Sequence, residues 1–279
     1  MSIQIPLFEL PPTGKGNETS RALEAVHAEA RAIASELPPE ICFGTSSWSF
    51  PGWKGLVYSG ALPAASLSRE GLREYSRHPL LRTVGIDRTY YAPISVDELR
   101  AYASQLPAGF RCCTKAPASI TGLAIGPAGT APSTNPHFLS ADRFIHDLLL
   151  PFALVFQEHA GPFILEFPPF PRQARLEPAD FIARLDRFLG QLPREFDYAV
   201  ELRDTRLLTP AYRDALARHN VAHTFNYWSA MPMPAAQADI VRPEDLPFIV
   251  VRLLLRPGTW YRTSASSSGR STPSCSPTS

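Results

Sequence analysis

Residues 198–203 have the sequence Tyr-Ala-Val-Glu-Leu-Arg. The larger apolar side chains occupy every second position, which predicts a β-strand with one face against an apolar layer. Glu201 and Arg203 lie on the other face. Alternation of this kind is typical of a barrel wall, where one face is covered by helices and the other faces the interior.

Six further segments have the short, β-branched or aromatic composition of strands: 41–46, 81–87, 110–115, 163–167, 221–226 and 248–254. Helical patterns lie between most of them and begin at recognisable caps, such as Ser95 with Glu98, Ser140, Pro178 and Thr209. Alternating strands and helices indicate a parallel sheet with helices outside. The predicted fold class is therefore α/β, a TIM-type (β/α) barrel with seven recognisable strands and no eighth.

The two ends of the chain differ from the middle in composition. We expect a flexible arm over 1–18, a helix within 19–39, the barrel domain over 40–261 and a separate tail over 262–279. The tail contains eight serines in 18 residues and no large apolar side chain. Two interpretations stay open, a disordered end or a reading frame lost near 262, and we favour the second. The Gly- and Pro-rich stretch 116–139 predicts a functional lid or disorder.

Overall composition limits the classes of function. The chain has 27 Lys+Arg and 26 Asp+Glu, so general attraction to polyanions is excluded, although a local basic groove is not. Hydrophobic residues make up 44%, which excludes global disorder. No signal peptide and no run of about 20 apolar residues is present, and the four cysteines lack metal-binding spacing. We expect a cytoplasmic protein that does not enter membranes.

Charged residues mark the interior face or the end of several predicted strands: Asp87, Lys115, Glu166, Glu201, Arg203 and Arg252. Buried charges must pair or line a hydrated site. One interpretation is a structural ion-pair network among Lys115, Glu201, Arg203 and Arg252. The other is an active site at the carboxyl ends of the strands. In that site Glu201 acts as general acid or base with Lys115 and Asp87, while Arg203, Arg252 and Glu166 bind the substrate.

The expected ligand follows from the neighbouring charges and rings. Lys115, Arg203 and Arg252 set against Glu201 favour a phosphate- or carboxylate-bearing substrate. Trp48 and Tyr91 follow the first two strands and are candidates for stacking on a ring of the substrate, or for packing over the barrel end. We expect no cofactor. The alternative is a divalent metal held by Asp87, Glu166, Glu201 and His223.

Several of these strands resemble the motifs of the YecE-like family, known as domain of unknown function 72. The resemblance runs over about 41–260 and rests on the sets Gly44–Trp48, Val84–Tyr91, Phe110–Lys115, Phe163–Pro169, Ala199–Arg203 and Val251–Leu253. It implies a TIM-type barrel and an intracellular protein without an established biochemical role. The chain departs from the family pattern at Gly85, Glu166 and Leu254–Leu255, and lacks its final strand.

A separate motif lies in the arm. Gln4-Ile-Pro-Leu-Phe8 resembles the pentapeptide with which bacterial repair and replication proteins bind the sliding clamp. The resemblance implies clamp binding through Gln4, Leu7 and Phe8, and a bacterial DNA-repair context. Three hypotheses about function therefore stay open: an enzyme, a hydrolase or lyase, acting on DNA or on a small anionic molecule; a non-catalytic clamp- or nucleic-acid-binding protein; and an inactive truncated product.

Overall fold

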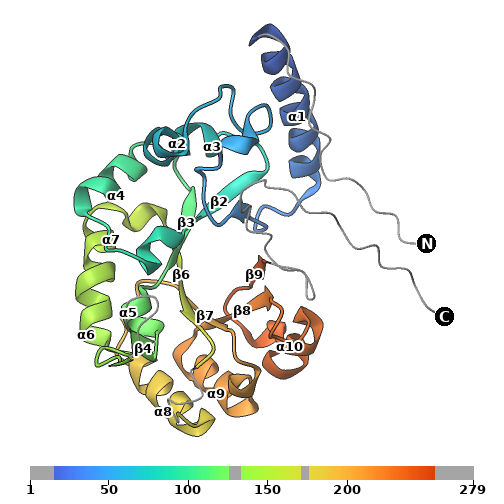
Figure 1. Ribbon diagram of the computed structural model, residues 1–279. Helices are drawn as coiled ribbons and strands as arrows, with labels where there is room; N and C mark the ends of the chain where they lie inside the picture. Colours follow the sequence, from blue (N-terminus) through green and yellow to red (C-terminus); the bar gives the residue numbers. More distant parts are fainter. Residues whose placement is uncertain (1–15, 126–132, 171–175, 255–279) are drawn as a thin grey trace, which may run out of the picture.

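A single parallel sheet organises the chain. The computed structural model describes residues 16–125, 133–170 and 176–254. Seven strands form a curled sheet in the order β1-β2-β3-β6-β7-β8-β9, and every neighbouring pair is parallel (Figure 1). Their bounds are β1 Phe43–Thr45, β2 Leu81–Ile86, β3 Arg111–Lys115, β6 Ala160–Phe167, β7 Tyr198–Leu202, β8 Ala222–Tyr227 and β9 Val250–Leu253. Each overlaps one of the seven predicted strands, which confirms them.

Helices lie on the outside of the curled sheet, as Figure 1 shows for α4, α7, α8 and α9. The bounds are α1 Gly16–Glu36, α2 Ala64–Glu70, α3 Leu72–Tyr75, α4 Val96–Ala103, α5 Ala118–Thr121, α6 Ala141–Phe144, α7 Leu150–Val155, α8 Pro178–Leu189, α9 Pro210–His219 and α10 Pro234–Val241. Four of them begin as their sequences predict, among them α8 at Pro178. Ser95 and Glu98 form a capping box at α4, and the side chains of Ser140 and Thr209 cap α6 and α9.

The sheet is an open barrel. Among the described residues β1 pairs only with β2 and β9 only with β8, so the two ends of the sheet are not joined by backbone hydrogen bonds. The architecture is that of a TIM-type barrel whose eighth strand is missing from the described ranges, which confirms the predicted fold class. The tail, about which the sequence left two interpretations, lies outside these ranges.

The main core fills the space between the sheet and the helices. It is rich in aromatic rings, and Phe163 of β6 is fully buried there with Phe144, Phe152 and Phe196 at ring-centroid distances of 6.2, 5.1 and 5.3 Å. Edge-to-face packing of this kind adds to the area that each ring buries. The apolar side chains at every second strand position therefore lie on the face of the sheet that the helices cover.

The stretch 116–139 is structured on both sides of its undescribed centre. α5 is followed by β4 (Ala124–Ile125), which pairs with β5 (Ser133–Thr134) in an antiparallel ladder. The buried side-chain amide of Asn135 donates hydrogen bonds of 2.7 Å to the carbonyls of both Ser119 and Gly122. These contacts attach the returning segment to the one that leaves β3.

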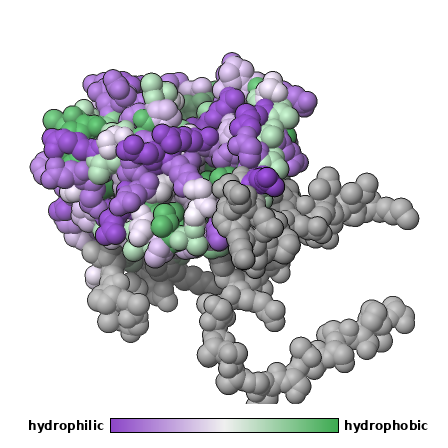
Figure 2. Space-filling model, turned by 90° about the horizontal axis from the view of Figure 1, so that it is seen from above, coloured by the Kyte–Doolittle hydropathy of each residue, from purple (hydrophilic) through white to green (hydrophobic). Residues whose placement is uncertain are grey.

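At the amino-terminal end, α1 begins at Gly16, inside the segment expected to be a flexible arm, and it covers most of the predicted helix. Its ring contact with the barrel is His27, which packs edge-on against His78 at 4.8 Å. Within the described ranges, none of the helices has the length and apolar content that a membrane span requires. The face of the molecule in Figure 2 is largely hydrophilic, and its hydrophobic residues occur in separate patches.

We predict that Phe163→Ala lowers the free energy of unfolding by about 3–5 kcal/mol, because it removes a fully buried ring and leaves a cavity. Urea denaturation followed by tryptophan fluorescence measures the change. Leu154→Ala, at a side chain of α7 that is 72% exposed, is the matched control and should shift it by no more than about 0.5 kcal/mol. Equal effects of the two substitutions would contradict this description of the core.

Candidate functional site

The interior of the barrel is built in two layers. The lower layer is a small apolar cluster in which Ile164, Ala199 and Ala222 pack with Cys113 and Val250. Two residues farther along four of these strands, on the same face because strand side chains alternate, a charged residue follows. The pairs along each strand are Cys113 and Lys115, Ile164 and Glu166, Ala199 and Glu201, and Val250 and Arg252. Charge therefore gathers above an apolar floor, at the carboxyl ends of the strands.

Six side chains form what we call the charged cluster: Asp87, Lys115, Glu166, Glu201, Arg203 and Arg252. Glu166 Oε2 lies 2.7 Å from Lys115 Nζ and 2.6 Å from an Arg203 terminal nitrogen. Glu201 Oε1 accepts from Arg203 Nε at 3.1 Å. Glu201 Oε2 accepts from an Arg252 terminal nitrogen at 2.7 Å. The other terminal nitrogen of Arg252 donates to Asp87 Oδ2 at 2.8 Å.

These contacts show why the charges tolerate burial. The cluster contains three cations and three carboxylates, so its formal charge is zero. The sequence prediction that three cations face Glu201 alone is therefore incomplete, because Asp87 and Glu166 share them. Burial by itself lowers the pKa of Arg252, but the carboxylates of Glu201 and Asp87 outweigh it and raise that pKa above the ordinary value.

Two aromatic rings cover the cations of the cluster. Lys115 Nζ lies 4.0 Å from the centre of the Tyr90 ring, and the Arg203 guanidinium lies 4.3 Å from the centre of the Trp228 ring. Cation–π contacts of this type stabilise a desolvated cation by about 1–2 kcal/mol. Trp228 follows β8 and Tyr90 follows β2, so the sequence is consistent with both rings near the barrel mouth. It does not distinguish them from other aromatics there, because the cation contacts depend on the three-dimensional positions of the strand ends.

The two aromatic residues expected to stack on a ligand lie in different environments. Trp48 is buried, donates its Nε1–H to the Leu67 carbonyl at 3.0 Å and packs edge-on against Tyr102. Tyr91 is 81% exposed and contacts Tyr90 edge-on at 5.1 Å. Trp48 thus belongs to the packing of the barrel end, while the face of Tyr91 is open to solvent.

A cavity of about 110 Å³, which we call the mouth cavity, lies beside Asp87. Its lining includes Ser46, Ser47 and Gly85 at the strand ends, with Ser68 of α2 and Tyr102 of α4 on the helix side, and of the charged cluster only Asp87 lines it. A Cβ at Gly85 would lie 3.0 Å from the Ser46 backbone and 3.1 Å from Asp87 Oδ1. The sequence gives little sign of this cavity, because two serines after a strand are common in any loop.

Comparison with known proteins now identifies the family. The model of the family "Protein of unknown function DUF72" matches residues 42–272. The chain belongs to the DUF72 family. The resemblance inferred from the strand motifs is thereby confirmed.

A solved structure of a DUF72 protein agrees with the fold. This protein, from Enterococcus faecalis V583, is 18% identical, with a TM-score of 0.54, over 80% of this chain and 74% of the other. A DUF72 protein from Thermotoga maritima MSB8 is 14% identical, with a TM-score of 0.48, over 76% of this chain and 92% of the other. The curated proteins yield no match to this DUF72 chain.

In this DUF72 chain the four alternative metal ligands do not converge. His223 points to the outer face of β8, where Nε2 donates to Gln237 Oε1 at 3.1 Å and Nδ1 lies 2.9 Å from the Tyr212 hydroxyl. The three carboxylates face the interior instead. Within residues 16–125, 133–170 and 176–254, no group of three or more His, Cys, Asp or Glu side chains is arranged to hold a metal ion.

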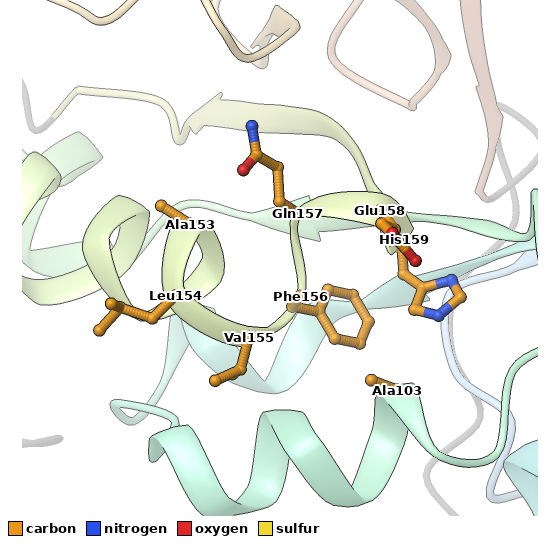
Figure 3. A pocket seen from close by; sticks show the side chains of 8 residues that line it. All are labelled: Ala103, Ala153, Leu154, Val155, Phe156, Gln157, Glu158 and His159. Atoms are coloured by element: carbon orange, nitrogen blue, oxygen red, sulfur yellow. The ribbon is translucent and has the colours of Figure 1, made fainter.

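A second hollow lies at the opposite end of the barrel. Its volume is about 270 Å³, and it is lined by the end of α7, the turn Gln157–His159 and Ala103 of α4 (Figure 3). These segments precede the amino ends of β3 and β6, whereas the chemistry of barrel enzymes takes place at the carboxyl ends. The charged cluster and the mouth cavity are therefore the candidate site. Gln4, Leu7 and Phe8, predicted to bind the clamp, lie outside the described residues, and that hypothesis stays a prediction.

We predict that His223 makes the stability of the chain depend on pH. Burial lowers its pKa to about 4. Between this value and the ordinary pKa, His223 is therefore protonated in the unfolded chain and neutral in the folded chain. The resulting stability is complete above the ordinary pKa of about 6.5 and is lost as the pH falls toward 4, by up to roughly 3 kcal/mol.

His223→Gln should therefore reduce the difference between the free energies of unfolding at pH 7 and pH 4, as measured by urea denaturation. The matched control is His146→Gln, at an exposed histidine of the helix that follows Ser140, and it should leave most of the difference. An unchanged difference in His223→Gln would show that the proton binds elsewhere.

Proposed function

We propose that this DUF72 chain binds a small ligand with a phosphate or carboxylate group at the barrel mouth, and that it is an enzyme whose Asp87 exchanges a proton with that ligand. The observation that supports this most directly is that the three carboxylates differ in exposure and in the number of cations that each contacts. Asp87 is 29% exposed and contacts one cation, Arg252. Glu201 is fully buried and contacts two cations, and Glu166 is nearly so and contacts three.

This inequality defines how an anion would enter. Rotation of Asp87 toward solvent breaks one ion pair and leaves three cations against two carboxylates. The cluster then has a net charge of about +1 by that count, and the terminal nitrogen of Arg252 that Asp87 occupied becomes free. A guanidinium presents N–H donors in a planar fork that suits a carboxylate or phosphate. An incoming anion thus takes the position of Asp87 and restores neutrality.

The mouth cavity adjoins this exchange through Asp87, and it offers space for the part of the ligand that lies beyond the anionic group. At about 110 Å³ it holds the volume of about three or four water molecules, enough for several atoms next to that group. It adjoins Asp87, so a ligand there keeps a carboxylate within reach after the exchange. The hydroxyls of Ser46 and Ser47 offer further hydrogen bonds. This arrangement suits a small molecule better than a rigid duplex.

The roles of the acidic residues follow from access. A general acid or base must reach the proton that it transfers. Both oxygens of Glu201 contact arginines in the interior, so we assign Glu201 to positioning Arg203 and Arg252 rather than to proton transfer. Glu166 holds Lys115 and Arg203 in the same way. Asp87, at the edge of the mouth cavity, is the acid or base that solvent and ligand can reach.

We predict opposite effects of two substitutions on the binding of inorganic phosphate or a small carboxylate, measured by isothermal titration calorimetry. Asp87→Asn removes the internal competitor and should tighten binding by about tenfold. Arg252→Gln removes the fork and should weaken binding by about tenfold or more.

Each substitution has a control that changes the same charge elsewhere. Asp197→Asn removes a carboxylate of the exposed pair with Arg111, and Arg213→Gln breaks the surface pair with Asp214. Neither should alter the affinity. Weaker binding by Asp87→Asn would argue against displacement and favour a direct role of Asp87 in holding the ligand.

A DNA ligand remains the alternative, and salt separates the two. A single anionic group should give a change of about one decade in affinity, or less, for each decade of salt. Binding through several phosphates gives a slope several times steeper. A labelled single-stranded oligonucleotide and a one-phosphate ligand, titrated in parallel by fluorescence anisotropy and calorimetry, test this. A steep slope with the oligonucleotide, at higher affinity than the small ligand, would overturn the small-molecule proposal.

A further inference from the structure

The mouth cavity contains hydrogen-bonding groups that the fold leaves unused. Ser46, after β1, and Ser68, of α2, both line it, and neither hydroxyl makes a hydrogen bond to the described residues. Asp87 contributes Oδ1, which also lacks a partner among the described residues, while the ion pair with Arg252 uses Oδ2. Two hydroxyls and a carboxylate oxygen thus border one hollow, from the strand ends and from the helix side.

The charges of the walls favour neutral hydroxyl groups over a second anion in the cavity. Arg88 is the cation among the lining residues, and its guanidinium is paired with Glu98. Asp87, the remaining charge of the walls, accepts hydrogen bonds and donates none. A ligand hydroxyl suits these surroundings, because it donates to a carboxylate and can both donate to and accept from a serine hydroxyl.

Aromatic rings form another part of the lining. Trp48 and Tyr102 pack edge-on, with their ring centroids 4.9 Å apart. The polar atoms of both side chains are already engaged, since Trp48 Nε1 donates to the Leu67 carbonyl and the Tyr102 hydroxyl lies 3.5 Å from Arg88 Nη1. A carbon chain that carries hydroxyls matches this mixture, with C–H groups for the rings and O–H groups for the polar wall.

We propose that the ligand of this site is a hydroxylated phosphate or carboxylate, such as a sugar phosphate or a sugar acid, with its hydroxyl-bearing carbons in the mouth cavity. This inference rests on the proposed function, because the anionic group of the ligand is the one that takes the position of Asp87 on Arg252. The cavity volume of about 110 Å³ is enough for about three hydroxylated carbons.

The exchange at Arg252 and the binding of hydroxyls assist each other. In the unliganded arrangement Arg252 holds Asp87 Oδ2. When an anion takes this cation, both oxygens of Asp87 become free to accept from ligand hydroxyls, and these charge-assisted hydrogen bonds offset the loss of the ion pair. A phosphate without hydroxyl-bearing carbons provides no such compensation. Asp87 therefore competes with every anion and favours those that carry hydroxyls.

Two phosphate esters of equal carbon number test this preference. Glycerol 3-phosphate and propyl phosphate differ by two hydroxyls, and isothermal titration calorimetry with the full chain gives the affinity for each. Glycerol 3-phosphate should bind at least about tenfold more tightly, because propyl phosphate leaves Ser46, Ser68 and Asp87 without partners in the cavity. Glycerate and propanoate repeat the comparison for a carboxylate, and show which of the two anionic groups the site prefers.

Substitutions test whether the preference arises in the mouth cavity. The readout is the ratio of the two affinities, because it cancels any effect of a substitution on the phosphate group alone. Ser68→Ala should lower the ratio by about threefold or more. Ser66→Ala, on the same helix and outside the lining, is the matched control and should leave it unchanged. Asp87→Asn should lower the ratio while it tightens the binding of propyl phosphate, since an amide has one uncharged acceptor oxygen in place of two charged ones.

The outcomes separate this inference from the proposed function. Binding of inorganic phosphate that depends on Arg252, together with equal affinities for glycerol 3-phosphate and propyl phosphate, would refute the inference and leave the proposed function standing. A preference that survives both Ser68→Ala and Asp87→Asn would place the hydroxyls outside the mouth cavity and refute it as well. If neither the phosphates nor the carboxylates bind, the inference and the proposed function both fail.

Discussion

The ion pairs of Arg252 are the contacts on which the open barrel most depends. β9 and β2 lie near opposite ends of the sheet order, with no backbone hydrogen bonds between them, yet Arg252 joins Asp87 after β2 to Glu201 on β7. The curled sheet is thus held from inside by charged side chains where a complete barrel would be held by strand pairing. Removal of one partner from such a buried set is strongly destabilising, by about 3–5 kcal/mol, because the charge left behind lacks a counterion. The proposed binding at the mouth and the closure of the sheet therefore depend on the same residues.

Much of the fold was predictable because its determinants are local. Alternation along residues 198–203 depends on neighbours in the chain, and the helix caps at Ser95, Ser140 and Thr209 act within one turn. The same period of two also identifies which face of each strand the six charged residues occupy. What it does not predict is distance: that Glu166 shares Lys115 and Arg203 follows from the register between strands far apart in sequence. The sequence therefore identified the members of the cluster, but not their pairing or the burial of Trp48.

The pairing changes the chemistry expected of the site. Glu201 is the charged residue most deeply placed in the cluster, and the sequence suggests it as an acid or base because it lies on the interior face near the carboxyl end of its strand. Its contacts with Arg203 and Arg252 make it a residue that positions these two cations. In the proposed function, the residue that exchanges a proton with the ligand is therefore Asp87. Membership of the DUF72 family establishes the barrel. Under the proposed function, the small cavity beside Asp87 limits the size of the ligand. Gly85 contributes to that limit through the side chain it lacks, an effect that residue-by-residue interpretation does not reveal.

The long sequence separation between Asp87 and Arg252 also has a consequence for synthesis. Asp87 and Arg252 are 165 positions apart in the sequence. The strands of the large sheet, in contrast, pair in the order in which they occur along the chain. Strands that pair in chain order can assemble as the polypeptide leaves the ribosome, but contacts of high sequence separation form late. Until β9 emerges, Asp87 has no cation in the cluster, and Glu201 has only Arg203. On this order of assembly the cluster would have three carboxylates and two cations until β9, the last of the described strands, brings Arg252 to neutralise it.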